Sequence, residues 1–401
     1  GFRAEDLLQG GIGDCWFLSA LAVVAERPDL ILRLFGGATA NNSSGRYGLR
    51  LFLDGQWRTV TIDDQFPCTD SQRRPDGSGL AFSRANGQQL WVPLIEKAYA
   101  KAHGSYKSIS GGEIAEALLD LTGAPTETID FDEVDPQELW QRLKHFKDCG
   151  FPMGCATAGN PELREVGLVG NHAYSILDVR EIAAGRLSGA PPSFAAAGAH
   201  CLLRIRNPHG VGEWNRDWSD ASAQWTDTLA QELGRTGVDD GTFWMDFTHF
   251  LMAFQVVDVC FAHRAWHSQS LRNMFCSKAE SSRLCRYAYE IKVRERTTVF
   301  VSALQPTKRG AWCREDRKKS YRPGDVSLLL VRLKGGAGQG TDSRQVEAVT
   351  AATLTGSTCR STVSTTLDPQ GDGESYLLLP MCLGAGPFAS EARSVDEAPF
   401  H

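Results

Sequence analysis

The sequence lacks three features that would each point early to one class of protein. Its longest apolar stretch, around Trp16–Ala25, is far shorter than the roughly 18 residues that a membrane-spanning helix needs. Its 11 cysteines are odd in number and form no Cys-x-x-Cys pair, which argues against a disulfide framework or a zinc ribbon. The net charge of −6 argues against a general nucleic-acid binder, and we expect no nucleic-acid partner.

What remains is typical of a folded enzyme or binding protein. The chain has 401 residues, 42% of them hydrophobic, which predicts two or three domains with a sizeable core. Unpaired thiols are more common in a reducing compartment, so we expect a cytoplasmic protein.

Helices and one hairpin are predicted in the first part of the chain. Residues 14–26 have apolar side chains at helical spacing, with Asp14 as the N-cap and Pro28 as the stop. The stretch "RYGLRLFLDGQWRTVTIDD" alternates around Asp54-Gly55, which predicts a hairpin. "LWVPLIEKAYAKAHGSY" predicts a helix that ends near Gly104, and we expect Gly111-Gly112 to be a hinge between two subdomains.

Strands dominate the pattern from about residue 150. "HAYSILDV" and "HCLLRIRNP" both alternate, and the Ala-, Gly-, Ser- and Pro-rich stretch between them indicates a surface insertion. "DGTFWMDFTHFLMAF" predicts a strand followed by a short helix.

After about residue 260, strand-like runs alternate with polar or Gly-rich loops. The runs "YEIKVRERTTVFVSALQ", "VSLLLVRLK", "VEAVTAATL" and "ESYLLLPMCL" predict an antiparallel sandwich. The loop "KGGAGQGTDS" is not followed by an apolar helix, which argues against a phosphate-binding loop. The basic stretch at 314–322 is interpreted as a solvated loop, with a membrane-surface or partner contact as the alternative.

Cys15 stands where the first helix is expected to begin. A helix N-terminus and a nearby imidazolium lower the pKa of a thiol from about 8.5 to roughly 3–7, which makes it nucleophilic. Gly10, Gly11 and Gly13 allow a tight turn before the thiol and leave room for a substrate.

A thiol nucleophile needs a histidine and a group that orients it. His172 opens one of the alternating strands and Asn207 closes the next, so antiparallel pairing would bring the two side chains to one edge of a sheet. A cysteine on a helix facing such a pair is the papain-like arrangement. Gln9 is spaced so that its amide can lie beside the backbone N–H of Cys15 and donate to an oxyanion.

Each of these residues also has an ordinary interpretation. A single cysteine in an apolar helix is usually a packing residue, a histidine on a strand is usually structural, and an asparagine before proline usually belongs to a turn. The combination of all four residues in this order favours the catalytic interpretation.

Five segments together resemble the protease core of the calpains. They are "QGGIGDCWFLSA", "HAYSILDVRE", "LLRIRNPHG", "EWNRDWSD" and "DGTFWMDF", and the resemblance covers roughly residues 3–260. Residues 262–401 resemble the calpain β-sandwich domain in pattern only. "FLSALAVVAERPDL" and "LWVPLIEKAYAKAHGSY" are most similar to the small-optic-lobes type of calpain, and plant membrane-linked calpains are also similar.

The resemblance implies an α+β fold with a papain-like core in two subdomains, followed by an all-β sandwich. We therefore expect a helical, Cys-bearing subdomain at 1–112, a β-rich His/Asn-bearing subdomain at 113–260 and the sandwich at 261–401. It also implies an intracellular endopeptidase that makes limited cuts in protein substrates, with Cys15 as nucleophile, His172 as general acid/base, Asn207 as orienting residue and Gln9 as oxyanion donor. The sandwich domain would regulate, or bind substrate or membrane surfaces.

Regulatory calcium is also implied, with one site in each subdomain. Asp6 matches a family ligand in the first subdomain, and Glu213, Asp220 and Asp240 match ligands in the second. Gln89 and Thr242 stand where the family has glutamates, so both sites have lost one carboxylate and weaker binding is expected. Surface charge is the alternative interpretation of the four acidic residues, and no EF-hand loop is present.

His209 is a further departure, because the family usually has a tryptophan there that covers the His–Asn pair. A smaller and wetter cover would weaken the hydrogen bond that fixes His172, unless another aromatic such as Trp214 compensates. Two alternatives to the protease stay open. A calpain-like scaffold that does not cut is left open by His209 and Gln89, and a transglutaminase-like acyltransferase uses a similar thiol–imidazole site, although it normally pairs histidine with aspartate.

Overall fold

The structure is a computed structural model with side chains. It describes residues 2–36, 44–69, 79–85, 89–182, 199–275, 285, 287–307, 309, 326–334, 345–353, 360–371, 373–382 and 398–400. The described chain divides into two compact units, which are 1–52 with 57–265, and 53–56 with 266–401. Three segments named above lie outside the described residues: the insertion between the two alternating strands, the Gly-rich loop and the basic stretch.

The first unit begins with a buried helix, α1 (Cys15–Ala25), in which every residue after Cys15 is buried. Asp14 occupies the N-cap position as expected, but its side chain makes no capping hydrogen bond. Pro28 does not stop this helix, which has already ended at Ala25; it begins the next helix, α2 (Pro28–Leu34). Proline is favoured at a first helical position because its missing N–H would have no helical partner there.

The predicted hairpin is confirmed, with β2 (Arg46–Leu53) and β3 (Gln56–Asp63) on either side of Asp54 and Gly55. Both turn residues have positive φ, at 50° and 74°, which is the conformation that an Asp-Gly hairpin turn favours. The predicted helix near Gly104 is α3 (Trp91–Ala102), and Gly104 follows it with a φ of 96°.

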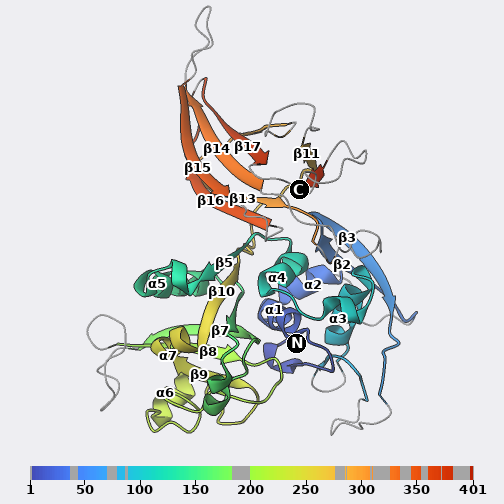
Figure 1. The fold of residues 1–401 in the computed structure, drawn as a ribbon, viewed down its shortest axis with the longest axis vertical. Helices are drawn as coiled ribbons and strands as arrows, with labels where there is room; N and C mark the ends of the chain where they lie inside the picture. Colours follow the sequence, from blue (N-terminus) through green and yellow to red (C-terminus); the bar gives the residue numbers. More distant parts are fainter. Residues whose placement is uncertain are drawn as a thin grey trace, which may run out of the picture. The chain divides into compact units, whose positions relative to one another are not determined.

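The remaining short elements of this region complete the helical part of the first unit. They are η1 (Ala4–Asp6), β1 (Leu7–Leu8), β4 (Arg84–Ala85), η2 (Tyr106–Ile109) and α4 (Ile114–Thr122). β1 pairs with β4, and α4 packs against α1 (Figure 1).

A six-stranded antiparallel sheet forms the other part of the first unit, in the order β5-β10-β6-β7-β8-β9. Its strands are β5 (Thr126–Asp130), β6 (Met153–Thr157), β7 (Ala173–Ile182), β8 (His200–Arg206), β9 (Thr242–Asp246) and β10 (Phe254–Cys260). The predicted pairing of the two alternating strands is confirmed, because β7 pairs with β8 from Ser175 opposite Arg206 to Ile182 opposite His200. The strand and short helix predicted after residue 240 are β9 and α7 (Phe247–Ala253).

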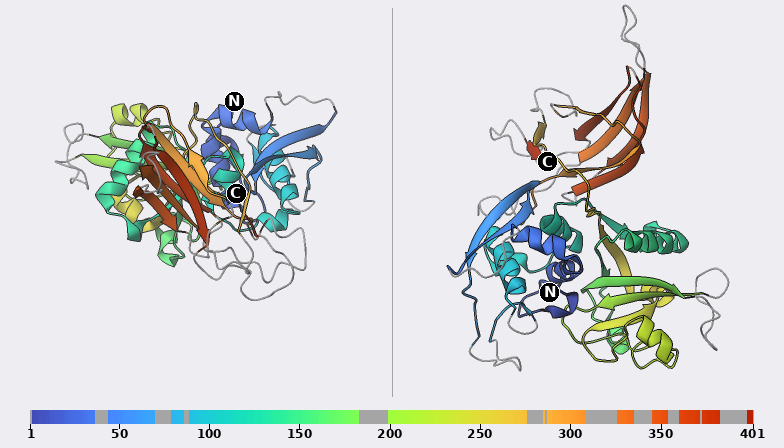
Figure 2. Two further views of the ribbon diagram at one scale, coloured as in Figure 1. Left: turned by 90° about the horizontal axis from the view of Figure 1, so that it is seen from above. Right: turned by 180° about the vertical axis from the view of Figure 1, so that it is seen from behind.

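Helix α1 lies against this sheet, as both Figure 1 and the rear view in Figure 2 show. Two hydrogen bonds of 3.0 Å join them: the Ser19 hydroxyl donates to the Ala173 carbonyl, and the Ser175 hydroxyl donates to the Ser19 carbonyl. These two serine hydrogen bonds hold α1 beside the start of β7.

Further helices not expected from the sequence are η3 (Phe131–Glu133), α5 (Pro136–Asp148), η4 (Pro161–Val166) and α6 (Asp227–Glu232).

The second unit is built from strands, as predicted for the sandwich. One sheet has the order β12-β17-β14-β15, and a second pairs β13 with β16. The strands are β12 (Tyr289–Ile291), β13 (Thr297–Leu304), β14 (Val326–Lys334), β15 (Gln345–Thr353), β16 (Arg360–Leu367) and β17 (Ser375–Cys382), with β11 (Asn273–Phe275) paired to β18 (Ala398–Phe400). One buried cluster joins the two sheets, including Ala303, Leu328, Leu330 and Leu367.

Fold class is therefore confirmed as a mixed helix and antiparallel-sheet core followed by a β-rich domain. Among the described residues, no helix is both long enough and apolar enough to cross a membrane.

Candidate active site

The antiparallel pairing of β7 and β8 brings His172 and Asn207 together. His172 immediately precedes β7 and Asn207 immediately follows β8, so both stand at one end of the strand pair. The His172 Nε2 and the Asn207 Oδ1 are 3.0 Å apart, and both side chains are buried. His172 and Asn207 therefore meet as predicted, at one end of the β7–β8 strand pair.

The amide of Asn207 is held in one orientation by three further bonds. Its Nδ2 donates to the carbonyls of Val211 and Gly212 at 3.0 and 3.1 Å, and its Oδ1 accepts from the backbone N–H of His209 at 3.1 Å. A flipped amide would place donors against donors and acceptors against acceptors. Because Oδ1 only accepts, the His172 Nε2 carries the hydrogen, and Nδ1 is the nitrogen with a free lone pair.

Cys15 is half-buried at the first position of α1. The backbone N–H groups of Ala173, Trp16 and Cys15 itself donate toward its sulfur and favour the thiolate. Ala173 is the neighbour of His172, so the sulfur lies beside the start of β7. No hydrogen bond joins the Cys15 sulfur to the His172 ring, both of which are described.

Burial dominates the electrostatics of both groups. Loss of water around the sulfur raises the pKa of Cys15 above its ordinary value. Burial, and then the neighbouring His209, lower the pKa of His172 to about 4, although the bond to Asn207 acts in the opposite direction. A thiol whose pKa lies above that of its imidazole partner keeps its proton, so this conformation holds a neutral pair.

The Gln9 side-chain amide is hydrogen-bonded within its own loop. Its Nε2 donates to the carbonyl of Ile12 at 2.8 Å, inside the loop that precedes α1, and its Oε1 is buried without a partner. The backbone N–H of Gln9 donates to the Pro208 carbonyl at 3.1 Å, which ties this loop directly to the turn that follows Asn207.

His209 covers His172, at the position where the sequence predicted a smaller and wetter cover. The two rings stack with centroids 4.3 Å apart and planes 30° apart, and His209 itself is exposed. Trp214 does not take over this cover, because its ring packs against His249 and its Nε1 donates to the Asp217 carbonyl.

The carboxylates of the second expected calcium site are neighbours. The Glu213 Oε1 accepts from the backbone N–H groups of Asp240 and Gly241, both at 2.9 Å. Burial and the charge of Asp220 raise the pKa of Glu213 to about 7, and burial raises the pKa of Asp220. One Asp220 oxygen is buried without a partner. Nevertheless, no group of three His, Cys, Asp or Glu side chains among the described residues is arranged to hold a metal ion as it stands.

At the first expected calcium site, one Asp6 oxygen is also buried without a partner. The Gln89 Oε1 accepts from the indole N–H of Trp91 at 3.0 Å, and the charge of Asp6 acts on the guanidinium of Arg206.

Two features of the site were not anticipated from the sequence. Arg206, buried at the end of β8, donates to the carbonyls of Leu7 and Glu5 at 2.8 and 3.2 Å. Asp14 and Glu96 form a buried carboxyl pair directly before Cys15. The sequence predicts Asp14 only as a helix cap, and nothing in the local pattern marks a partner 82 residues away.

Comparison with known proteins decides the family. The sequence model described as calpain family cysteine protease matches residues 1–261. The chain belongs to the calpain family of cysteine proteases.

Relatives within the family include plant and animal calpains. The chain is 37% identical over 268 residues to the calpain-type cysteine protease DEK1 of Zea mays, covering 64% of this chain and 11% of that protein. It is 35% identical over 270 residues to calpain clp-1 of Caenorhabditis elegans, covering 65% and 32%. It is 32% identical over 284 residues to the calpain-1 catalytic subunit of Rattus norvegicus, covering 68% and 37%. The aligned region thus spans roughly a tenth to two fifths of these calpains, and the likeness to the small-optic-lobes type stays a prediction.

Proposed function

We propose that this calpain-family chain is a cysteine endopeptidase in which Cys15 is the nucleophile, His172 moves the proton and Asn207 orients the imidazole. The observation that carries the proposal is the buried 3.0 Å contact between His172 and Asn207, made at the end of the strand pair against which the Cys15 helix packs. The fixed amide of Asn207 supports the proposal further, because it leaves Nδ1 as the base.

The reaction follows from these groups. His172 Nδ1 takes the proton from the Cys15 sulfur as that sulfur bonds to the peptide carbonyl carbon. His172 then gives the proton to the leaving nitrogen, the C–N bond breaks, and an acyl-thioenzyme remains. Water attacks the thioester with His172 as base, which releases the carboxylic acid and restores the thiol. The N–H groups at the start of α1, and Gln9 after it leaves Ile12, donate to the oxyanion.

Because Cys15 and His172 are both neutral in this conformation, the proposal includes a rearrangement that brings them together. The pKa of Cys15 is raised and that of His172 is lowered, so the conformation described here is a resting form. Activation requires the two halves of the core to bring Nδ1 to the sulfur, so that an imidazolium then favours the thiolate. We infer that the segment around Gly111, whose φ of 74° is a glycine conformation, is where the chain bends.

Calcium is the proposed trigger of this rearrangement. The negative charges of the second expected site suit a divalent cation. Glu213, Asp220 and Asp240 would hold the ion, which supplies positive charge to carboxyl groups that now raise one another's pKa. The buried oxygen of Asp220 without a partner supports the same proposal. The first site, built on Asp6, stays a prediction.

Protein substrates, cut at a limited number of positions, are proposed from the family, and so is an intracellular location. The contact of the sandwich with membrane surfaces stays a prediction, since the basic stretch that suggested it lies outside the described residues.

A scaffold that does not cut is the second candidate function. The exposed His209 favours it, because this ring lowers the pKa of the base that it covers. The acyltransferase alternative gains no support from the site, because the residue that contacts His172 is Asn207 and not an aspartate.

Peptide hydrolysis with and without calcium tests the proposal. We expect cleavage by the wild type in calcium, none above background by Cys15→Ala, and no incorporation of a primary amine. Cleavage that persists in Cys15→Ala would overturn the assignment of the nucleophile. A wild type that binds substrate proteins without cutting them under any calcium concentration would favour the scaffold.

A further inference from the structure

Two carboxyl groups face each other in a buried place directly behind the proposed nucleophile. Asp14 precedes Cys15 at the start of α1, and Glu96 projects from α3; both are 0% exposed. The two carboxyl groups are close enough for a hydrogen bond between them to shift the pKa of each. Neither carboxyl is used in the mechanism above, so the arrangement calls for a separate explanation.

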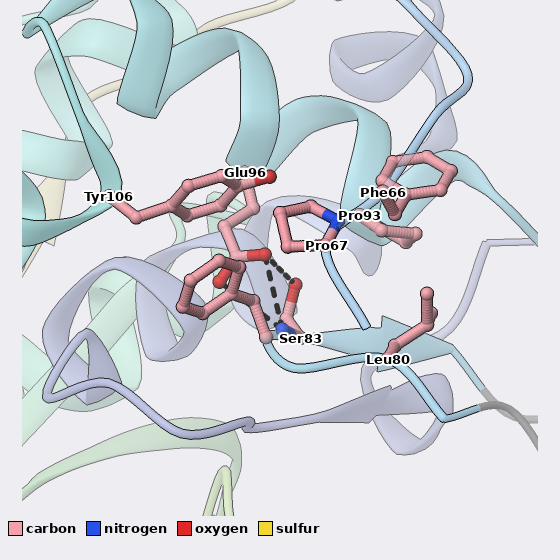
Figure 3. Close-up of a pocket in the computed structure, with 8 residues that line it drawn as sticks. Phe66, Pro67, Leu80, Ser83, Pro93, Glu96 and Tyr106 are labelled. Carbon is pink, nitrogen blue, oxygen red and sulfur yellow. Dashed lines mark hydrogen bonds between the residues drawn. The ribbon is translucent and has the colours of Figure 1, made fainter. Parts of the chain in front are cut away.

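Glu96 has two further donors from another residue, and Asp14 has none. The backbone N–H of Ser83 donates to Glu96 at 3.1 Å, and the Ser83 hydroxyl donates to the same oxygen at 2.7 Å (Figure 3). Within the described part of the chain, neither Asp14 oxygen accepts a hydrogen bond from another residue, and only the Asp14 backbone N–H acts on this carboxyl as a donor. The surroundings of Glu96 are mostly apolar, including Phe66, Leu80, Phe82 and Pro93. No basic side chain is among the groups that shift the pKa of either acid.

The close contact of the two carboxyl groups requires that they share one proton. Two ionised carboxylates can only accept hydrogen bonds, so the bond between Asp14 and Glu96 requires a proton on one of them. Two like charges in a buried site where no basic side chain acts on them are strongly unfavourable, which also requires one proton. The donors from Ser83 stabilise the charge on Glu96, so the proton belongs to Asp14, whose O–H donates to Glu96.

The capping residue is thereby drawn away from its own helix. An aspartate at an N-cap normally accepts from the N–H groups of the first turn, but the Asp14 side chain makes no such bond. The N–H groups of Cys15 and Trp16 instead act on the Cys15 sulfur and lower its pKa. A charge on Asp14 would also raise the pKa of the adjacent thiol.

We propose that Asp14 and Glu96 are positioning residues that share one proton, hold the first turn of α1 open toward the Cys15 sulfur and keep the negative charge of the pair on the carboxyl farther from it. The proposal rests on Cys15 being the nucleophile, but its consequence for the thiol can be measured without any proteolysis. The other titratable groups around the pair are Tyr106, whose pKa both acids raise, and Asp63, which acts on Tyr106 and pairs with Lys97.

Two isosteric variants with the same net charge separate this proposal from a structural role. In Asp14→Asn the amide donates to Glu96, and the charge stays where it is in the wild type. In Glu96→Gln the amide donates to Asp14 while its oxygen accepts from Ser83, so the charge moves to the residue beside Cys15. Both variants keep the hydrogen bond and the side-chain volumes, and differ only in where the charge sits.

The readout is the rate of Cys15 alkylation by iodoacetamide against pH, with the labelled peptide identified by mass spectrometry because Cys68 and Cys149 are also exposed. We expect Glu96→Gln to raise the apparent pKa of the Cys15 thiol by about 1 unit or more, which slows alkylation about tenfold below that pKa. We expect Asp14→Asn to keep a profile close to the wild type. Equal shifts in the two variants, or no shift in either, would overturn the proposal.

A second measurement covers the case in which one variant does not fold. The infrared carbonyl band of a protonated carboxylic acid is expected in the wild type at pH 8 and is expected to disappear in whichever variant folds. A wild type without this band would overturn the shared proton. Failure of peptide hydrolysis in the wild type, with both readouts as expected, would count against the proposed function and not against the pair.

Discussion

His209 is the residue whose departure from the family pattern has the clearest chemical consequence. Its ring lies on His172 and, after burial, is the main group that lowers the pKa of that imidazole. A histidine with an unfolded pKa near 6.5 and a folded pKa of about 4 binds fewer protons when folded. It therefore destabilises the fold progressively as the pH falls from about 6.5 to about 4, and contributes no such loss above that window.

His209→Phe should narrow the pH range in which burial of His172 destabilises the fold. A phenyl ring keeps the stacking and removes the second ionisable ring, so the pKa of His172 should rise toward its ordinary value, and less stability should be lost between pH 6.5 and pH 4. NMR titration of the His172 ring and thermal unfolding at several pH values check this. His145→Phe, on the exposed side of α5, is the control and should leave the His172 titration unchanged. A His172 pKa that stays near 4 in His209→Phe would contradict the electrostatic explanation.

Only some residues of the candidate site can be predicted from the sequence. His172 and Asn207 were predictable because strand alternation places them at the ends of two strands that pair. The hydrogen-bond partner of the Gln9 amide was not predictable, because this amide can donate to the Ile12 carbonyl three residues away as well as to a substrate. The Asp14–Glu96 pair and Arg206 depend on contacts across 82 and about 200 residues, for which the local pattern holds no signal.

At the level of elements, the loop before α1 is fixed by close backbone approach. A Cβ at Gly10 would lie 2.1 Å from the backbone carbon of Phe82, a distance that no rotamer change can relieve. Gly10 is therefore required by space, in addition to any room that it leaves for a substrate.

Gly10→Ala should displace this loop and with it Gln9. We expect a loss of roughly 1–3 kcal/mol in the free energy of unfolding, together with a fall in kcat for peptide hydrolysis. Gly48→Ala is the matched control, since its Cβ would meet only a Thr59 methyl group at 3.3 Å. Denaturant unfolding and steady-state kinetics measure the two effects. An equal loss in both variants would mean that the contact with Phe82 is not what matters.

The end of β8 is joined to the start of the chain by one buried side chain. Arg206 is 1% exposed, and its donors reach the carbonyl of Leu7 in β1 and of Glu5 in η1. Asn207 follows Arg206 directly, so the same strand end carries both the orienting amide and this link.

Arg206→Met should leave those carbonyls without donors. The expected cost is about 1–3 kcal/mol of unfolding free energy, and hydrogen exchange in residues 5–9 should become faster. Arg180→Met, on the neighbouring strand β7 and with a half-exposed side chain, is the control. Unchanged exchange in residues 5–9 would show that β1 is held by its pairing with β4 alone.

For the whole molecule, the sequence predicted the fold class better than the individual helices and strands. The hairpin, α3, the β7–β8 pair and the β-rich second unit were predictable because Asp-Gly turns and alternating apolar residues report local geometry directly. Helix α5 and strands β5, β6, β10 and β16 were not identified. Strands β6 and β10 are largely buried, which removes the alternation that marks a half-exposed strand.

The proposed control by calcium concerns the whole core, because it would require a rearrangement of its two halves. We expect peptide cleavage to rise with calcium, and Asp220→Asn to raise the calcium concentration for half-maximal activity by roughly tenfold. Asp217→Asn, in the same loop, is the control. A titration of cleavage rate in the presence of a chelator measures both, and activity that is unchanged by chelation would remove calcium from the account.

The most direct test of the central claim is covalent labelling with a peptidyl fluoromethyl ketone, followed by peptide mapping. One adduct is expected, on Cys15. It should form in the wild type, be lost in Cys15→Ala and form at least 100 times more slowly in His172→Ala, in line with the roughly 10²–10⁴-fold contribution of a general base. An adduct on any other cysteine, or one on Cys15 that forms at the same rate without His172, would contradict the central claim.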